Sequence, residues 1–580
     1  MPEIFIDNIR YEFEGKPKVL QFMLDQGLDH PFFCYHPSLS IPANCRQCYV
    51  EAGTPVMNRE TNDWELDENG ERVIRYFPKL MTSCSLEATD GMVIKTHRTS
   101  ELVKRGHKDV LEFILMNHPL DCPICDQAGE CPLQIQTYKY GPEGSRFEHK
   151  KVHKPKRIKL GPRVILDAER CINCTRCVRF TDEISKTHQL TIISRGDKNY
   201  PAVAPGTEFD DPYSLNTVDI CPVGALTSAD FRFKARVWEM NQTPSIDITN
   251  GKGCNTDVWV RNNLVLRITP RYNPDVNDHW MPDIGREDYR RMNENRISRP
   301  DLKLDGNKIK SSWSNAEMTF AETISNAKPE EFLVLGSAFS SLEDNFTLQK
   351  FFKSRGIENI SFVTNIQKGS GDGFLMDDDQ YPNTNGCRML GFEELSPATF
   401  KKKVSGGKYK VIISLEDDLL GREVIDTTDL NSAFFVYFGS NNNKTSEAAD
   451  LVIPISNSVE TPSTYINVDG RCQRTVPAKE TIYTNRKLNL EMSVGRLDRY
   501  GTKFDNWVSD RNRVDCIPGW EFLERVALLD NSNFGYETSE DIIHEIAHTN
   551  SNFSGVSYEA MDEQLGVQLK VTKETKEKTA

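Results

Sequence analysis

"RCINCTRCVRF", residues 170–180, contains three cysteines at C-x2-C-x2-C spacing, Cys171, Cys174 and Cys177. A fourth cysteine, Cys221, lies in "DICPVGALTS", residues 219–228, where a proline follows it directly. Bacterial-type ferredoxins bind 4Fe–4S clusters with this run and a remote Cys-Pro. Three thiolates in one loop bind three corners of the cube, and the fourth arrives from another part of the fold. These four residues, the Cys171 group, therefore predict one 4Fe–4S cluster in a ferredoxin-like domain.

A second set of candidate ligands lies upstream in "HPLDCPICDQAGEC", residues 118–131. This His118 group consists of His118, Cys122, Cys125 and Cys131. Three thiolates and one imidazole supply one ligand for each iron of a second 4Fe–4S cluster. The alternative for His118 is an ordinary hydrogen bond at a helix end. With three cysteines in the group, however, a 4Fe–4S cluster still needs a fourth ligand. A neutral imidazole makes the cluster less negative, so we expect a raised reduction potential, as in Rieske centres.

The Cys34 group comes first in the chain, in "FFCYHPSLSIPANCRQC" (32–48) and "MTSCSLEATDGM" (81–92). It consists of Cys34, Cys45, Cys48 and Cys84. Four thiolates can bind a 2Fe–2S cluster, two on each iron, and four cysteines can also bind zinc. Spacing leaves both open, while the short β-hairpin and helix before the group favour iron–sulfur.

Composition fits a soluble protein of several domains. The 580 residues are 38 % hydrophobic and 27 % charged, with a net charge of −14, and the acidic balance argues against nucleic-acid binding. We find neither an apolar run of membrane-spanning length nor a signal-peptide pattern, so we expect a cytoplasmic protein. Clustered cysteines then indicate metal ligands. The isolated ones are predicted to be buried small apolar residues: Cys254, Cys387, Cys472 and Cys516.

The first 244 residues are predicted to form three small domains. "EIFIDN" and "IRYEFEG" predict a hairpin, and "KVLQFMLDQGLD" a helix, as in a β-grasp 2Fe–2S ferredoxin-like domain over 1–95. Residues 57–77 look like an inserted polar hairpin turning at "DENG". A helix over 100–116, capped by Ser100, opens a His/Cys3 4Fe–4S domain over 96–150. A 4Fe–4S ferredoxin-like domain follows over 151–244, and the basic stretch 149–163 before it is interpreted as a solvated linker or a surface for an acidic partner.

The remainder has a different character. "FLVLGS", "ISFVTN", "KVIISL", "FFVYFG" and "LVIPIS" predict buried strands, and helical stretches such as "LEDNFTLQKFFKSRG" alternate with some of them. This alternation predicts a parallel sheet of the α/β class over 245–570, before a disordered tail over 571–580. A nucleophile elbow, a Walker loop and a G-x-G-x-x-G motif are missing from the sequence, so the chain is predicted to relay electrons without a complete active site of its own.

These motifs, in this order, resemble the large iron–sulfur subunit of respiratory complex I, NADH:quinone oxidoreductase (the G-type, or 75 kDa, subunit). "FCYHPSLSIPANCRQC", "HPLDCPICDQAGEC", "CINCTRCVRF" and "DICPVGALTS" carry the resemblance over about residues 30–230. "FRFKARVWE" and "RITPRYNPDVNDHW" extend it to about 285. "LVIPISNSVETPSTYINVDGRCQR" resembles the molybdopterin-oxidoreductase fold of the family's C-terminal half.

The resemblance implies one 2Fe–2S cluster at the Cys34 group and 4Fe–4S clusters at the His118 and Cys171 groups. It implies that these clusters carry single electrons from a flavin subunit, which oxidises NADH, toward quinone. Implied partners are the flavin/NADH-binding subunit, a small ferredoxin-like subunit and the quinone-site subunits of the peripheral arm. The implied location is the cytoplasmic side of the bacterial inner membrane, where partner subunits hold the chain without a membrane span of its own.

The sequence departs from the family in two places. Some members carry a further 4Fe–4S cluster after residue 245, but here that segment keeps Cys254 alone and has Pro282 near a wanted cysteine, so we predict that this cluster is absent. The spacing between Cys48 and Cys84 is also long for the family, which makes Cys84 the weakest ligand assignment. We find no molybdenum ligand in context, and expect the C-terminal domain to be catalytically silent.

Three other interpretations compete with this one. Iron-only hydrogenases and formate dehydrogenases share the cysteine modules but need a second C-x2-C-x2-C run or a catalytic cysteine. The iron–sulfur subunit of a soluble NAD-linked hydrogenase is usually shorter, without this C-terminal half. A scaffold with structural zinc and no redox role is a rival from another class, and metal content distinguishes it.

Overall fold

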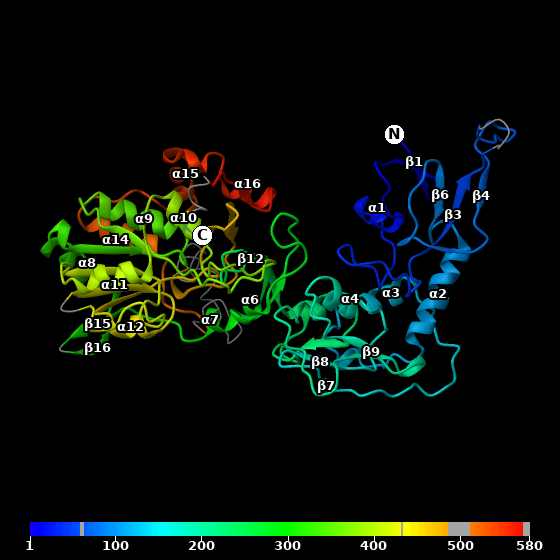
Figure 1. The fold of residues 1–580 in the computed structure, drawn as a ribbon, viewed down its shortest axis with the longest axis horizontal. Helices are drawn as coiled ribbons and strands as arrows, with labels where there is room; N and C mark the ends of the chain where they lie inside the picture. Colours follow the sequence, from blue (N-terminus) through cyan, green and yellow to red (C-terminus); the bar gives the residue numbers. More distant parts are fainter. Residues whose placement is uncertain (58–62, 305, 431–432, 485–510, 572–580) are drawn as a thin grey trace, which may run out of the picture. The chain divides into compact units, whose positions relative to one another are not determined.

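The computed structural model of the chain describes residues 1–57, 63–304, 306–430, 433–484 and 511–571. The chain divides into two compact units, Met1–Glu239 and Met240–Ala580 (Figure 1). Both units mix helices and strands and have hydrophobic cores of their own. The tail predicted over 571–580 lies, from residue 572 on, outside the described residues.

The N-terminal unit begins with a six-stranded sheet of order β2-β1-β6-β3-β4, in which β5 pairs with β3. The predicted β1–β2 hairpin turns at Asp7 and Asn8, whose positive φ angles of 50° and 68° suit a two-residue turn. Helix α1 buries Leu20 and Met23 in the core of this sheet. The elements are β1 (Glu3–Ile6), β2 (Ile9–Glu12), α1 (Val19–Asp25), β3 (Tyr49–Pro55), β4 (Ile74–Tyr76), β5 (Met81–Thr82) and β6 (Met92–Lys95).

The hairpin predicted over 57–77 is present. Leu66 pairs with Arg72 across it, and Gly70 N–H donates to the Asp67 carbonyl at 3.1 Å, which closes the turn at "DENG". The hairpin projects beyond the end of the sheet (Figure 1). Residues 58–62 lie outside the described part.

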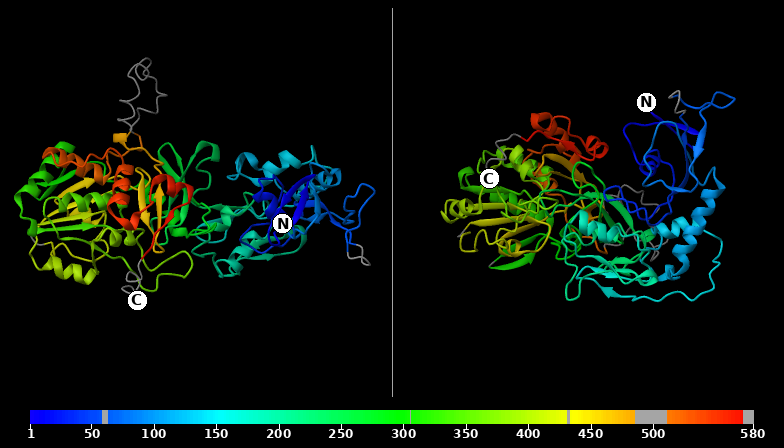
Figure 2. Two further views of the ribbon diagram at one scale, coloured as in Figure 1. Left: turned by 90° about the horizontal axis from the view of Figure 1, so that it is seen from above. Right: turned by 45° about the vertical axis from the view of Figure 1, so that its right-hand side comes forward.

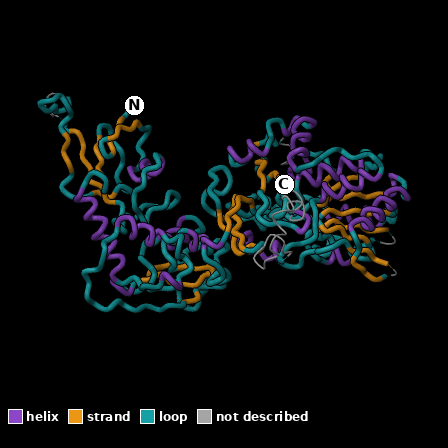
Figure 3. The backbone as a smooth tube through the Cα atoms, turned by 180° about the vertical axis from the view of Figure 1, so that it is seen from behind, coloured by secondary structure: helices purple, strands orange, loops and turns teal. Residues whose placement is uncertain are grey.

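The rest of this unit consists of short elements joined by much loop (Figure 3). The predicted helix is α2, and its Ser100 cap accepts a hydrogen bond from Val103 N–H at 3.3 Å. The elements are α2 (Glu101–Met116), η1 (Cys122–Ile124), α3 (Pro132–Tyr140), β7 (Ile158–Lys159), β8 (Val164–Leu166), α4 (Arg176–Glu183), β9 (Thr191–Ile193), η2 (Gly196–Lys198), β10 (Tyr200–Ala202), α5 (Asn216–Asp219), β11 (Leu226–Ser228) and η3 (Val237–Glu239).

The C-terminal unit is built on an eight-stranded sheet of order β16-β15-β22-β21-β20-β17-β18-β19. Neighbouring strands from β22 to β19 pair in parallel, as predicted, and β15 and β16 add antiparallel pairs at one edge. The strands are β15 (Asp301–Leu304), β16 (Asn307–Lys310), β17 (Phe332–Gly336), β18 (Ile360–Val363), β19 (Glu393–Leu395), β20 (Val411–Leu415), β21 (Phe434–Gly439) and β22 (Leu451–Pro454).

Helices cover both faces of this sheet (Figure 2). Consecutive β17 residues alternate between two cores, with Phe332 and Val334 in one and Leu333 and Leu335 in the other. This explains the unbroken apolar run of the strand. Helices of the unit are α6 (Asp283–Glu287), α7 (Tyr289–Asn293), α8 (Trp313–Asn326), η4 (Pro329–Glu331), α9 (Leu342–Lys353), α10 (Thr384–Met389), α11 (Pro397–Ser405), α12 (Lys444–Ala448), α14 (Gly519–Leu529), α15 (Ser539–Thr549), η5 (Ser551–Phe553) and α16 (Tyr558–Glu563).

Two three-stranded sheets complete the unit, with orders β12-β13-β14 and β23-β24-β25. Cys254 directly precedes β13 and is buried, like the other three isolated cysteines, which confirms the prediction for all four. The strands are β12 (Asn241–Ile246), β13 (Asn255–Arg261), β14 (Leu264–Pro270), β23 (Ser463–Ile466), β24 (Arg471–Thr475) and β25 (Val567–Gln568). In the described part of the chain, no helix combines the length and apolar character that crossing a bilayer requires.

Candidate iron–sulfur sites

The four thiols of the Cys34 group lie close together at one end of the first sheet. Cys34 follows α1, while Cys45 and Cys48 lie in the loop before β3, where Arg46 has a φ of 60°. Cys34 N–H donates to Cys45 Sγ at 3.5 Å. Hydrogen bonding to Cys45 lowers the pKa of the Cys34 thiol to about 6, so one thiol of this pair is readily a thiolate, the form that binds metal.

The long insertion does not separate Cys84 from the group. Ser83 N–H and Ser83 Oγ both donate to the Cys48 carbonyl, at 3.0 and 2.8 Å, because β5 pairs with the start of β3. Cys84 is fully buried, and hydrogen bonding between the two thiols lowers the pKa of Cys48 and raises that of Cys84. The inserted hairpin therefore brings Cys84 back beside Cys48.

The Cys171 group surrounds a small cavity of about 20 Å³. Cys171 and Cys174 lie in the loop after β8, Cys177 on α4, and Cys221 after α5. The loop is wound tightly, with positive φ angles at Asn173 and Thr175. Burial raises the pKa of Cys171 to about 11 and that of Cys221 to about 12, so these buried thiols would lose their protons on binding a cation.

The His118 group is assembled around η1 and the start of α3. Cys122 opens η1 and is exposed, Cys125 follows it and is buried, and Cys131 precedes α3. The loop between them turns at Gly129, whose φ is +92° and whose missing side chain makes room for the Trp238 ring. The charges of Cys125 and Cys122 act on the Cys131 thiol, and burial is the main reason that its pKa rises to about 11.

His118 lies two residues after the end of α2 and four residues before Cys122 in the ligand loop. Burial lowers the pKa of its imidazole to about 4, so the ring is neutral at pH 7. Its Nδ1 atom is buried and makes no hydrogen bond within the described chain. A neutral ring with an unused nitrogen is the state in which histidine binds metal.

The Cys34 and Cys171 groups are joined by two arginines of α4. Arg179 Nη2 donates to the Cys34 carbonyl at 2.6 Å and to the Cys174 carbonyl at 3.3 Å. Arg176 donates to the carbonyls of Tyr35 and Ile220, residues adjacent to ligands of the two groups. The two ligand loops are therefore packed as neighbours.

The Cys171 and His118 groups meet at the segment that follows Cys221. Cys131 Sγ contacts the Pro222 carbonyl at 3.7 Å. A Cβ atom on Gly224 would lie 2.2 Å from Cys125 Sγ, so the segment touches the His118 group where it has no side chain. Contacts thus run from the Cys34 group to the Cys171 group to the His118 group, which is not their order in the sequence.

Two lysines of the basic stretch 149–163 make contacts that the sequence did not predict. Lys151 Nζ donates to the Leu115 and Met116 carbonyls at 2.9 and 3.0 Å, which closes the C-terminal end of α2. Lys156 Nζ pairs with Asp121 Oδ2 at 2.5 Å. These two lysines therefore bind their own chain, although Lys156 stays 46 % exposed. Much of the stretch is solvated, as predicted, and a surface for an acidic partner stays a prediction.

The residues present fit iron–sulfur clusters on chemical grounds. Two groups supply four cysteines each, and the third supplies three cysteines and a neutral imidazole, all sets known to hold clusters. In the residues that the structure describes, no group of three or more His, Cys, Asp or Glu is arranged to hold a single metal ion.

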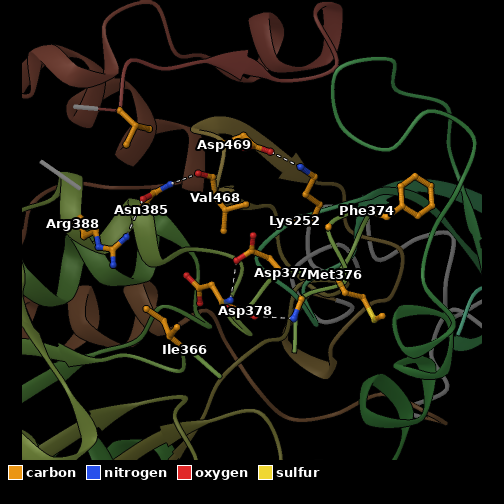
Figure 4. Close-up of a pocket in the computed structure, with 14 residues that line it drawn as sticks. Lys252, Ile366, Phe374, Met376, Asp377, Asp378, Asn385, Arg388, Val468 and Asp469 are labelled. Atoms are coloured by element: carbon orange, nitrogen blue, oxygen red, sulfur yellow. Dashed lines mark hydrogen bonds and ion pairs between the residues drawn. The ribbon is translucent and has the colours of Figure 1, made fainter. Parts of the chain in front are cut away.

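The C-terminal unit contains a cavity of about 550 Å³ that the sequence did not predict (Figure 4). Its wall includes Asp377, Lys252 and Arg388. Lys252 Nζ pairs with Asp469 Oδ2 at 2.6 Å, and Arg388 forms two hydrogen bonds with the Glu394 carboxylate, so both cations are already neutralised. The lining comes from segments far apart in the chain and has no local sequence signal.

Comparisons with known proteins agree with the motifs. A family model described as "NADH-ubiquinone oxidoreductase-G iron-sulfur binding region" matches residues 107–146. One described as "NADH-quinone oxidoreductase subunit 3, ferredoxin-like domain" matches 161–227. A third, "NADH-ubiquinone oxidoreductase NDSU1/NuoG-like, 4Fe-4S domain", matches 240–289, where this chain has the single cysteine Cys254.

Relatives that match 54 to 62 % of this chain agree with the family models. The G-type NADH-quinone oxidoreductase subunit of Rickettsia conorii is 36 % identical over 362 residues, which are 62 % of this chain and 50 % of that protein. NADH dehydrogenase [ubiquinone] iron-sulfur protein 1, mitochondrial, of Solanum tuberosum is 37 % identical over 359 residues, 62 % and 45 % of the two chains. The NADH-ubiquinone oxidoreductase 75 kDa subunit of Reclinomonas americana is 38 % identical over 317 residues, 54 % and 42 %.

A solved structure, "Crystal structure of NAD+-reducing [NiFe]-hydrogenase in the H2-reduced state", is similar over 41 % of this chain and 91 % of its own. The sequence identity is 26 % and the TM-score 0.33. A TM-score this low supports no inference about fold or function.

The segments around the His118 and Cys171 groups thus match models of iron–sulfur domains from NADH-quinone oxidoreductases. The chain is a homologue of the bacterial G-type and mitochondrial 75 kDa subunits, which confirms the resemblance seen in its motifs. The chain spans about half the length of these relatives, 42 to 50 %.

Proposed function

We propose that this chain is an electron-relay subunit of an NADH:quinone oxidoreductase of the complex I type. Its three ligand groups would bind one 2Fe–2S and two 4Fe–4S clusters, and bound clusters accept and release single electrons. The observation that carries the proposal is the direct packing of the three groups against one another, in the order Cys34 group, Cys171 group, His118 group.

The protein's own part in this relay is to hold ligands and exclude water. Cys34, Cys45, Cys48 and Cys84 would bind the 2Fe–2S cluster. The 4Fe–4S ligands would be His118, Cys122, Cys125 and Cys131 at one site and Cys171, Cys174, Cys177 and Cys221 at the other. Burial of most of these thiols supports the assignment, because a low-dielectric setting limits reorganisation of solvent around the charge.

The proposal also assigns a domain type to the N-terminal sheet and to the C-terminal unit. The first sheet, with β1 parallel to β6 and α1 against it, supports a β-grasp ferredoxin-like domain. The C-terminal unit would be a molybdopterin-oxidoreductase-like domain without catalysis. At the carboxyl ends of β17 and β20, where open α/β sheets bind ligands, polar side chains bond to the chain itself. Asn345 bonds the Ser337 turn, and Ser440 bonds the half-buried Glu416.

The relatives are named as subunits of NADH-quinone oxidoreductases, which supports the proposal that this chain has partner subunits. We propose that electrons arrive from a flavin/NADH-binding subunit and leave through a small ferredoxin-like subunit toward quinone-site subunits. The chain would lie peripherally on the cytoplasmic side of the bacterial inner membrane, held through those subunits. No further cluster is proposed for residues 245–285, because one cysteine is too few.

The test is iron and acid-labile sulfide per chain, with EPR after dithionite reduction, on anaerobically purified protein. We expect about ten irons, with one 2Fe–2S and two 4Fe–4S signals. Cys254→Ala is the control and should leave the iron content unchanged. About fourteen irons would reveal an additional cluster, and zinc without a reducible signal would contradict the relay.

The imidazole ligand gives a separate prediction. His118→Cys should lower the midpoint potential of one 4Fe–4S cluster, because a thiolate adds negative charge to it. An EPR-monitored redox titration measures the shift, and the other 4Fe–4S signal serves as the internal reference. An unchanged potential would mean that His118 is a helix-end histidine and not a ligand.

A further inference from the structure

Arg170 occupies the junction between the two predicted 4Fe–4S sites. It directly precedes Cys171, yet its side chain is 5 % exposed and pairs with Asp121, which lies beside the other group. Its Nη2 donates to Asp121 Oδ2 at 3.0 Å, next to Cys122 in the sequence. Its Nη1 donates to the Gly224 carbonyl at 3.4 Å, on the segment that touches Cys125.

The guanidinium is a buried positive charge beside the His118 group. Its hydrogen bonds to Asp121 and to the Gly224 carbonyl place it beside Cys122 and Cys125, where its charge acts on both His118 and Cys125. Reduction adds one negative charge to a cluster, so a nearby fixed cation favours the reduced form. Burial matters here, because solvent would screen the same charge at the surface.

A network of charges holds Arg170 in this place. Asp167 Oδ2 lies 3.2 Å from Arg170 Nε, and Asp167 is itself buried. Lys156 bridges Asp121 and Glu169 with Nζ–O distances of 2.5 and 2.6 Å. The network sets two cations, Arg170 and Lys156, against three carboxylates, of which Asp121 and Asp167 fix the guanidinium by geometry. Removing Arg170 or one carboxylate changes the local charge in opposite directions, so the two signs can be tested against each other.

We propose that Arg170 is a positioning residue that raises the reduction potential of the cluster at the His118 group and so favours electron transfer to it from the Cys171 group. This inference rests on the proposed function, since it needs a cluster at each site. In this inference Arg170 is not a ligand. Its charge contributes to a difference in reduction potential between the two 4Fe–4S sites of one chain.

The experiment is an EPR-monitored redox titration of the full chain with its clusters bound. Arg170→Gln should lower the midpoint potential of the His118-group cluster more than that of the Cys171-group cluster. Arg170→Lys keeps the charge and should stay nearer the unaltered protein. Arg157→Gln removes an exposed charge from the neighbouring basic stretch and should shift neither potential.

Asp167→Asn keeps the test informative if Arg170→Gln does not fold. Asp167→Asn removes an opposing charge without changing shape, so it should raise the potential of the same cluster. Equal shifts of the two cluster potentials would overturn this inference but not the proposed function. So would unchanged potentials in both Arg170→Gln and Asp167→Asn. Unaltered protein without reducible 4Fe–4S signals would instead overturn the proposed function, and this inference with it.

Discussion

Replacing Gly224 by alanine is expected to remove the cluster of the His118 group, so that iron falls from about ten to about six per chain. The new Cβ would lie 2.2 Å from Cys125 Sγ and 3.1 Å from Gln127 Cβ, in a segment that Cys221 and Arg170 hold in place. Contacts this short force the ligand loop to move, and overpacking of this kind typically costs about 1–3 kcal/mol. A displaced thiol would no longer reach its iron.

The measurement is iron content with EPR of the reduced Gly224→Ala protein. The 2Fe–2S signal and the signal of the Cys171-group cluster should persist, which would show that the unit is folded. Gly144→Ala is the matched control, because a Cβ there meets no atom within 4 Å, and its iron content should not change. Retention of both 4Fe–4S signals in Gly224→Ala would contradict the assigned contact between the two sites.

Glu460→Ala is expected to destabilise the C-terminal unit by about 3–5 kcal/mol, the usual cost of leaving a buried charge without its partner. Glu460 forms two 2.6 Å hydrogen bonds with Arg296, and the two side chains are 1 % and 4 % exposed. Arg296 also bonds the Ser440 carbonyl at 2.9 Å, so it cannot leave for solvent without breaking other contacts.

Hydrogen exchange resolved by mass spectrometry suits this test, because a chain of two units need not unfold in one step. Peptides from β21 and β22 should lose protection in Glu460→Ala, while peptides of the N-terminal unit keep theirs. Asp426→Ala breaks the exposed pair with Lys401 and should cost at most about 1 kcal/mol. Similar losses in the two variants would contradict a buried, uncompensated charge.

Replacing both partners supplies an independent check. Arg296→Met with Glu460→Leu removes both charges of the pair, so it should recover much of the protection lost in the single variant. A double variant that is no more protected than Glu460→Ala would mean that packing, and not charge, dominates at this site.

Local features of the sequence predicted much of this molecule. The C-x2-C spacings identify ligands that one loop can bring to one metal cluster, because neighbours in a chain are within a few ångströms of one another. Ser100 predicts the start of α2, and apolar runs such as "FLVLG" predict strands covered on both faces. Each of these inferences depends on residues close in sequence.

Other features depend on contacts between distant segments. The pairing of Cys84 with Cys48 depends on a hairpin that returns the chain, and the Gly224 contact with Cys125 depends on how two loops pack. Burial of Arg170 and capping of α2 by Lys151 likewise had no local signal, since arginine and lysine are usually solvated.

The sequence by itself determined which residues are the candidate ligands, how they fall into three groups and which family the chain resembles. Covalent spacing and side-chain chemistry suffice for those conclusions. Only the tertiary structure decided that the Cys171 group lies between the other two, and which arginine sits at each junction. Packing alone sets these contacts, because they join residues between about 50 and 150 positions apart, far beyond the range over which spacing constrains the chain.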